Sequence, residues 1–368
     1  MDGYYKKMDL STKRDIYKIE IHKPDEAAFN RAKNRFNSIA KPLDGLGDFE
    51  EMICKIAGIQ GDEDIQIKKR AALIMCADNG IVEEGISQSG KEITLNVARA
   101  LGSGISSACT LGKAAGVDVI PIDIGIDSDE GIEGVRNFKI AQGTRNFLKE
   151  PAMSETQVCK AIETSIELVK ELSEQGYSVL VTGEMGIGNT TTSTAVLAAA
   201  LNIDSDEITG RGAGIDDKGL SRKKEVIRKA LGLYIFNDIE DERERAFHIL
   251  QCVGGLDIAG LVGVVIGGAL YNMPVVLDGL ISVAAAVIAQ MLTPGVRDYM
   301  IASHAGREKG IFQALKFLDL KPFINGNMAL GEGTGGIMLF PLIDAVYNFY
   351  KNAARFNDYN MDEYKRYS

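Results

Sequence analysis

Short apolar runs recur along the middle of the chain, each bounded by polar residues or glycine. Four of them are predicted strands: Ala72–Ala77, Val117–Ile126, Ser178–Thr182 and Pro274–Leu277. Each run is continuous rather than alternating, which is typical of a parallel strand that is buried on both faces.

Helical patterns lie between these runs. Ser154 and Gln157 form a capping box, in which the hydroxyl accepts from an N–H of the first turn and the glutamine reaches back. Apolar residues then recur at steps of three and four from Val158 to Leu172, and Gly176 closes this helix. A further helix is predicted to start at Ser221.

Alternating strands and helices predict an α/β fold, with a mostly parallel, Rossmann-like sheet and helices on both faces. The two ends of the chain lack this alternation and look mainly helical. We therefore divide the chain into residues 1–66 and 313–368, which form a smaller helical subdomain, and residues 67–312, which form the sheet domain. Ligands of such sheets bind beyond the carboxyl ends of the strands, so glycine clusters after strands are candidate sites.

Charge and composition narrow the class of protein. The chain has 41 Lys and Arg against 51 Asp and Glu, a net charge of −10, which argues against a nucleic acid partner. Its five cysteines are widely spaced and form no C-x-x-C pair, so we expect buried thiols, a cytoplasmic protein and no metal site.

No membrane span or secretory signal is predicted. The most apolar stretch, 253–270, contains Asp257 and several glycines, so it is interpreted as a buried helix or helix–turn element. The first fifteen residues contain no apolar run of the kind that a secretory signal needs.

The glycine cluster after the third predicted strand, Gly183–Thr192, is the first candidate site. Its glycines allow a tight turn that presents N–H groups, and a following helix N-terminus attracts an anion such as phosphate. The spacing nearly matches a P-loop, but Asn189 stands where the P-loop lysine belongs, which weakens the interpretation as a nucleoside triphosphatase. A tight structural turn is the alternative, although Glu184 has no packing reason to lie inside such a turn.

Two further clusters complete the candidate chemistry. Residues 209–217 contain a G-x-G-x-G pattern, and Lys223 in the helix after it can supply one cation to a phosphate, or be an ordinary surface lysine. Glu332 lies between Gly331 and Gly333 on a loop that a ligand can approach closely. A glutamate in a dry site is a usable general base, and the alternative is a glycine-rich helix cap.

Three other polar residues are weaker candidates. Asp78 and Asp278 each follow a predicted strand and can bind a ligand or cap the next element. His304 has no second histidine at metal-binding spacing, so a hydrogen-bonded structural role is favoured.

These motifs together resemble one family. The chain is similar to the nicotinate-nucleotide:dimethylbenzimidazole phosphoribosyltransferases over roughly residues 28–350. The matching segments are GEMGIGNTT (183–191), LGEGTG (330–335), GRGAGIDD with Lys223, KPLDGLGDFE (41–50), GTRNF (143–147) and PAM (151–153).

The resemblance implies transfer of the phosphoribosyl group of nicotinate mononucleotide to an aromatic base. The product is an α-ribotide for the lower ligand of a cobamide, nicotinate is released, and no cofactor is needed. Glu332 is then the general base, and Glu184 lies near the ribose. The implied substrate-binding residues are Gly186, Ile187, Gly188, Asn189, Thr190, Gly212, Lys223, Met185, Ser87, Asn96, Asp78, Asp278 and Gly333.

The sequence departs from the family pattern in a few places. Asn79 replaces a histidine, Asp257 a glutamate, and Asn96 a glutamine that lines the base pocket in the family. These changes lie on the acceptor side, so the base can be a benzimidazole, a purine or a phenol.

The resemblance also implies a homodimer. The alternatives are a heterodimer with a paralogous subunit, in which this chain is the non-catalytic partner, and a P-loop-like phosphate-binding enzyme.

Overall fold

Six parallel strands form the central sheet of the computed structural model, which describes residues 9–365. The strand order is β3-β2-β1-β4-β5-β6. The strands are β1 (Arg70–Ala77), β2 (Asp118–Gly125), β3 (Arg136–Asn137), β4 (Val179–Met185), β5 (Val275–Leu277) and β6 (Met300–Ala302). The parallel, Rossmann-like sheet expected from the sequence is therefore confirmed. The order reverses between β1 and β4, where open sheets of this kind bind ligands.

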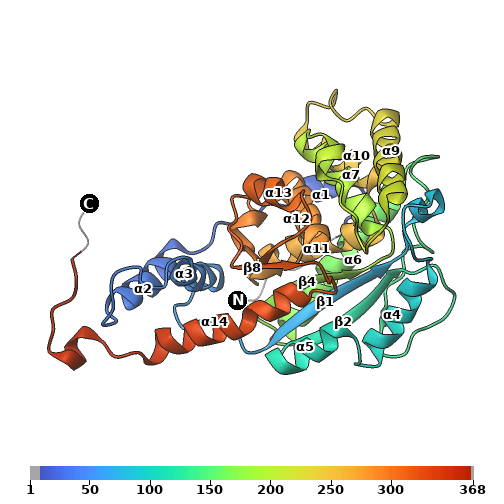
Figure 1. Ribbon diagram of the computed structural model, residues 1–368. Coiled ribbons are helices and arrows are strands. Elements are labelled where there is room, and N and C mark those ends of the chain that lie inside the picture. The colour runs from blue at the N-terminus through green and yellow to red at the C-terminus, as the bar shows by residue number, and fades with distance from the viewer. Residues whose placement is uncertain (1–8, 366–368) are drawn as a thin grey trace.

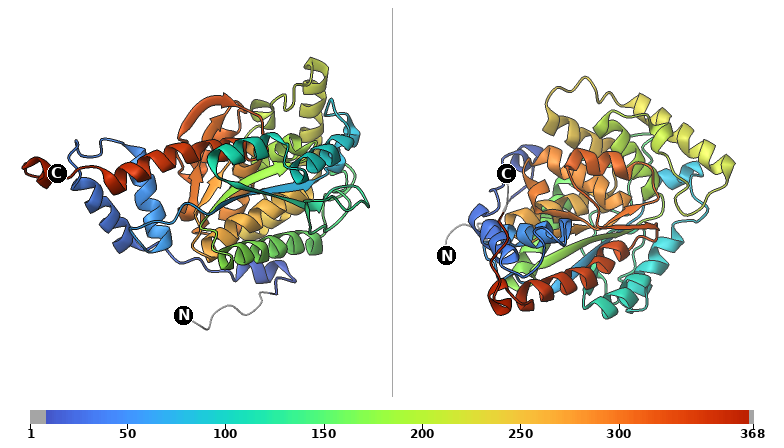
Figure 2. Two further views of the ribbon diagram at one scale, coloured as in Figure 1. Left: turned by 90° about the horizontal axis from the view of Figure 1, so that it is seen from below. Right: turned by 60° about the vertical axis from the view of Figure 1, so that its left-hand side comes forward.

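Both faces of the sheet are covered by helices, as the left view of Figure 2 shows. On β1, Leu73 and Met75 belong to one apolar core, and Ile74 and Cys76 belong to the other. The first face carries α6 (Glu155–Glu174), α7 (Asn189–Leu201), α10 (Glu242–Val253), α11 (Leu256–Leu270), α12 (Leu280–Leu292) and α13 (Ile311–Leu318). The second carries α3 (Asp48–Gln60), α4 (Glu92–Gly102), α5 (Ser107–Ala115) and α14 (Thr334–Asn352).

The remaining elements lie around this three-layer body (Figure 1). They are α1 (Lys13–Tyr17), α2 (Glu26–Asn37), α8 (Ser205–Ile208), α9 (Asp217–Leu233), and the 3-10 turns η1 (Gly80–Glu84), η2 (Val296–Tyr299) and η3 (Phe356–Tyr359). A second, two-stranded parallel sheet pairs β7 (His304–Gly306) with β8 (Ile324–Met328). Helix α2 packs on α3, and α14 runs from the sheet to these two helices. The division into domains stays a prediction.

Several local predictions are confirmed. The capping box exists, because Gln157 N–H donates to Ser154 Oγ at 3.2 Å and Ser154 N–H donates to Gln157 Oε1 at 2.8 Å. The apolar stretch is the buried helix α11, and no helix among residues 9–365 is long and apolar enough to cross a membrane. All five cysteines are buried free thiols. The N-terminal stretch searched for a secretory signal lies partly outside the described residues.

One local prediction is wrong. Helix α9 does not start at Ser221 but at Asp217, because Asp216 Oδ1 accepts from Gly219 N–H at 2.8 Å and so caps the helix earlier. The segment 313–368 is mainly helical as expected, through α13, α14 and η3, but residues 324–328 form β8, which the sequence did not indicate. This polar strand pairs only with β7 and is mostly exposed, so it carries no apolar run that could have indicated it.

Helices α6 and α11 approach each other through glycine. A Cβ atom at Gly263 would come within 2.5 Å of the carbonyl oxygen of Ile162, so no larger residue fits without separating the helices. We expect Gly263→Ala to lower the free energy of unfolding by about 1–3 kcal/mol, measured by urea denaturation. Gly232→Ala in α9 is the matched control. A Cβ at Gly232 meets no atom within 4 Å. Because alanine favours the helix more than glycine does, this substitution should raise the free energy of unfolding by up to about 1 kcal/mol. Equal effects of both substitutions would contradict this packing.

Candidate active site

A cavity of about 210 Å³ opens beyond the carboxyl ends of β4 and β5 and is closed on one side by the chain that follows β8. Its lining includes most of the residues singled out in the sequence: Glu184, Met185, Gly186, Ile187, Asn189, Thr190, Gly212, Asp278 and Glu332. Four segments far apart in the chain thus supply one site, since the carboxyl ends of parallel strands share one edge of the sheet.

Lys223 lies directly behind the glycine-rich loop. It projects from α9, is 1% exposed, and its Nζ donates to Thr190 Oγ1 at 2.8 Å. Burial lowers the pKa of this lysine to about 8, and the nearby Glu308 carboxylate opposes that shift. A Cβ at Gly212 would lie 3.5 Å from the same Nζ. The loop, Gly212 and one buried cation therefore meet at one end of the cavity.

Glu184 lies at the centre of a buried polar cluster. Asn189 Nδ2 donates both to Glu184 Oε2 and, at 3.0 Å, to Asp257 Oδ2. Burial raises the pKa of Glu184 to about 8; the Asn189 hydrogen bond opposes this, and the carboxylates of Asp257, Asp278 and Glu332 add to it. Burial likewise raises the pKa of Asp257 to about 6. The Asn189 amide thus bridges two buried acids, and their burial and like charges disfavour ionising both.

Glu332 is held on a left-handed loop. Its φ is +56°, between Gly331 at +85° and Gly333 at +74°, a run that only glycine neighbours readily permit. Ala108 N–H, in the first turn of α5, donates to Glu332 Oε2 at 3.1 Å. The N-terminal turn of a helix offers unpaired N–H donors, so this contact holds the Glu332 side chain at the edge of the cavity.

Asp278 binds the start of α14 rather than standing free. Its Oδ1 accepts from Gly335 N–H at 2.8 Å and from Gly336 N–H at 3.2 Å, while the residue still lines the cavity. Asp278 does not cap the next element, α12, whose N-cap is Gly279, but the first turn of the distant helix α14.

His304 is a cavity residue that the sequence placed only as structural. Ser303 Oγ donates to the carbonyl oxygen of Leu277 at 2.6 Å and lies 2.9 Å from His304 Nδ1. Since the hydroxyl has one proton, His304 Nδ1–H must donate to Ser303, which leaves Nε2 as the acceptor of the neutral ring. His304 and Glu308 both line the cavity.

Besides Lys223, five predicted residues do not line the cavity. Gly188 and Gly333 belong to the loops behind its wall; a Cβ at Gly188 would meet Val82 Cγ2 at 2.7 Å. Asp78, Ser87 and Asn96 lie farther away. Asp78 Oδ2 accepts from Asp127 N–H at 2.8 Å, and burial raises the pKa of Asp78. Ser87 Oγ accepts from Ser89 N–H, and Asn96 is exposed on α4. Their roles in substrate binding stay predictions.

The charges around the cavity are arranged asymmetrically. Among its lining residues, all within the described part of the chain, there are the carboxyl groups of Glu184, Asp278, Glu308 and Glu332 but no lysine or arginine. The buried cation Lys223 lies behind Thr190. The end of the cavity near Lys223 therefore favours an anion. The middle, which is lined by carboxyl groups, favours a group that becomes positive during a reaction.

The buried acids should make stability fall with rising pH. Glu184 ionises near 4.5 in the unfolded chain but near 8 in the folded protein, so between these values the folded state holds the extra proton. The free energy of unfolding then decreases as pH rises through this window, by at most about 1.4 kcal/mol per pH unit for one group. We expect Glu184→Gln to flatten this decline in urea denaturation between about pH 5 and 8. Glu174→Gln, an exposed carboxylate on α6, should leave it unchanged. Parallel curves for wild type and Glu184→Gln would refute the buried proton.

Comparison with known proteins places the chain in one family. A family model described as phosphoribosyltransferase matches residues 21–360. Nicotinate-nucleotide–dimethylbenzimidazole phosphoribosyltransferases of Clostridium perfringens and Ruminiclostridium cellulolyticum are 41% and 40% identical to it. The alignments cover 90% and 91% of this chain, and 91% and 94% of theirs. The crystal structure of CobT from Thermus thermophilus matches with a TM-score of 0.85 at 29% identity, over 92% of this chain and all of that one. The resemblance inferred from the motifs is thus confirmed, and the chain belongs to the nicotinate-nucleotide–dimethylbenzimidazole phosphoribosyltransferase family.

Proposed function

We propose that this protein transfers the phosphoribosyl group of nicotinate mononucleotide to a ring nitrogen of 5,6-dimethylbenzimidazole and releases nicotinate. The observation that carries the proposal is the opposition of two features across one cavity. A glycine-rich loop backed by Lys223 lies at one end, and the carboxylate of Glu332 lies on the other side.

The nucleotide phosphate is proposed to bind at the loop. The segment from Gly186 to Thr190 leads into α7, whose N-terminus favours an anion. Lys223 already donates to Thr190 Oγ1 and keeps further N–H donors for a phosphate oxygen. A single phosphate needs less positive charge than a triphosphate, which fits one lysine and argues against the P-loop alternative.

The reaction itself needs little from the protein beyond orientation and proton transfer. A lone pair of the acceptor nitrogen attacks the ribose carbon from the face opposite the pyridine ring. The bond to the pyridinium nitrogen breaks, and nicotinate leaves with that electron pair. Because the ribose carbon becomes positive in this step, the carboxyl oxygens of Glu184 and Asp278 that line the centre of the cavity stabilise it, and the developing positive charge itself favours ionisation of Glu184. Attack from the opposite face gives the α-linked ribotide.

Glu332 is the proposed general base. When one nitrogen of the benzimidazole bonds to the ribose, the other must lose its proton, and the Glu332 carboxylate accepts it. The left-handed loop and the bond from Ala108 N–H fix this carboxylate before the base arrives, which removes an orientation cost from the reaction.

Dimethylbenzimidazole is the favoured acceptor. The relatives at about 40% identity carry this base in their names. Of the departures from the family motifs, Asn79 and Asp257 lie behind Asn189 and outside the cavity lining, so they alter the surroundings of Glu184 and not the surface that a base would touch. A purine or phenol acceptor is the alternative.

We also propose that the active form is a homodimer, as the family resemblance implies. The competing hypothesis is a non-catalytic subunit that serves a paralogue. Nicotinate release by the purified chain alone, supplied with nicotinate mononucleotide and each acceptor separately, distinguishes the two. Release with dimethylbenzimidazole supports the proposal, whereas nucleotide binding without release under any acceptor favours the partner subunit.

Replacing the proposed base separates proton transfer from binding. We expect Glu332→Gln to lower kcat by roughly 10²-fold or more, because the amide cannot accept the benzimidazole proton. The Kd for nicotinate mononucleotide, measured by calorimetry, should change less than about twofold, since the amide keeps an oxygen for Ala108 N–H. Glu174→Gln is the charge-matched control. Weakened binding with an unchanged kcat would remove Glu332 from the proton-transfer role.

A further inference from the structure

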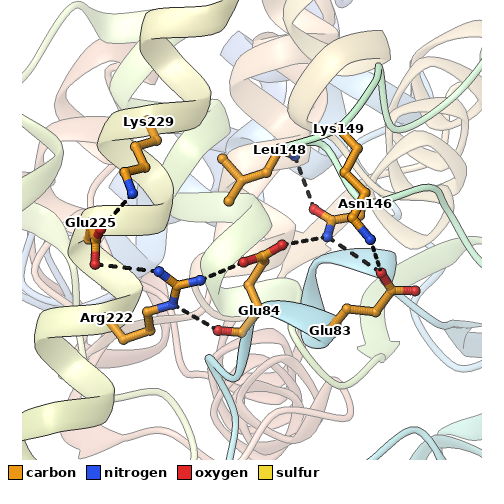
Figure 3. A network of polar contacts seen from close by, with 8 residues as sticks. All are labelled: Glu83, Glu84, Asn146, Leu148, Lys149, Arg222, Glu225 and Lys229. Atoms are coloured by element: carbon orange, nitrogen blue, oxygen red, sulfur yellow. Dashed lines mark hydrogen bonds and ion pairs between the residues drawn. The ribbon is translucent and has the colours of Figure 1, made fainter.

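A polar network joins the edge of α9 to η1 and to the segment after β3, outside the cavity (Figure 3). Its central residue is Arg222, which directly precedes Lys223 on α9. The two side chains serve different partners. Lys223 enters the protein toward Thr190, and Arg222 turns to Glu84 at the end of η1.

Arg222 makes two bonds to the same residue. Its NH2 group donates to Glu84 Oε2 at 2.5 Å, and its Nε donates to the Glu84 carbonyl oxygen at 3.1 Å. A guanidinium held at two points cannot swing about one bond, so this contact fixes the rotation of α9 as well as its distance from η1.

The Glu84 carboxylate is itself held in place. Its second oxygen, Oε1, accepts from Asn146 Nδ2 at 2.8 Å, and Asn146 is 5% exposed. Leu148 N–H donates to Asn146 Oδ1 at 3.0 Å, which orients the amide. Both carboxylate oxygens of Glu84 are therefore engaged, and the residue is a fixed anchor rather than a mobile surface acid.

The same 3-10 turn also touches the phosphate loop. A Cβ at Gly188 would lie 2.7 Å from Val82 Cγ2, so η1 and the loop are in close contact. The connections form a closed ring: η1 packs on the loop, Thr190 of the loop accepts from Lys223, and Arg222 returns to η1. The distance between the lysine and the loop is thus set from both sides.

Helix α9 is packed into the apolar core by Val226, Ile227 and Ala230, whereas its first turns, which lead to Lys223, follow a glycine-rich segment. It packs on α7 and α8 at the periphery of the molecule (Figure 1), and the segment before it contains Gly212 and Gly214 with positive φ. Glycines of this kind permit many backbone conformations. The lysine also has a flexible four-carbon side chain whose ordering is entropically costly.

We propose that Glu84 and Arg222 form a positioning clamp that holds Lys223 at the phosphate loop and so sets the affinity for the phosphate of the nucleotide. This rests on the proposed function, since it takes nicotinate mononucleotide as the ligand. Neither residue lines the cavity; both act through Lys223.

The test compares two ligands that differ only in the phosphate. Kd values are measured by calorimetry for nicotinate mononucleotide and for nicotinic acid riboside. We expect Glu84→Gln and Arg222→Ala each to weaken binding of the mononucleotide by about fivefold or more. Binding of the riboside should change less than about twofold. A general loss of structure would instead weaken the binding of both ligands.

A double-mutant cycle shows whether the clamp acts through the lysine. Lys223→Met should weaken mononucleotide binding strongly, and adding Arg222→Ala to it should weaken binding little further. The matched controls are Lys149→Met, which removes the outer contact to Glu83, and Glu174→Gln, an exposed carboxylate on α6 outside this network. Both controls should bind the mononucleotide as the wild type does.

The outcomes separate the clamp from the proposed function. If the wild type binds the mononucleotide no more tightly than the riboside, the phosphate site is wrong and the clamp falls with it. If the wild type binds the mononucleotide more tightly than the riboside, but Glu84→Gln and Arg222→Ala keep the same ratio of the two Kd values, only the clamp is wrong. An undiminished effect of Arg222→Ala in the Lys223→Met background would likewise overturn it.

Discussion

The buried carboxylate of Asp278 is the contact on which the arrangement of the site depends. It lies directly after β5 and accepts two backbone N–H groups from the first turn of α14. These groups have no partner inside the helix, so the Asp278 side chain satisfies two backbone donors that the helix itself leaves unpaired. The contact attaches the C-terminal part of the chain to the sheet. The position of Glu332, two residues before α14, follows from it.

Glycine makes this attachment geometrically possible. A Cβ at Gly335 would come within 2.2 Å of the His304 ring, and one at Gly336 within 2.4 Å of Val181 Cγ1. The start of α14 therefore lies directly on β4 and on the imidazole, with no side chain between. The glycines of the LGEGTG motif serve close approach as well as the left-handed turn around Glu332, which is why a carboxylate can project there from the backbone without a supporting helix.

The sequence predicted the parts of this site that have a local signal. The strands appeared as apolar runs, and the loops after them appeared as glycine clusters around Glu184 and Glu332. What it missed depends on contacts between distant residues. Strand β8 is polar, and the tautomer of His304 depends on Ser303 and the Leu277 carbonyl, whose positions only the fold defines. The contact between Glu84 and Arg222 joins residues 138 positions apart, both of types common on any surface.

Two separate sets of contacts hold the two ends of the cavity. The loop end is held through Thr190, Lys223 and η1, and the Glu332 end through Asp278 and the first turn of α5. Between them lies the Asn189 amide, which bonds to both Glu184 and Asp257. Since the end contacts share no residue, a substitution on the acceptor side can alter the pocket for the base without moving the lysine. Such a division lets the two ends of the cavity vary separately. The fold provides it because α7 leads from the loop on one face of the sheet, whereas α5 and α14 hold Glu332 from the other.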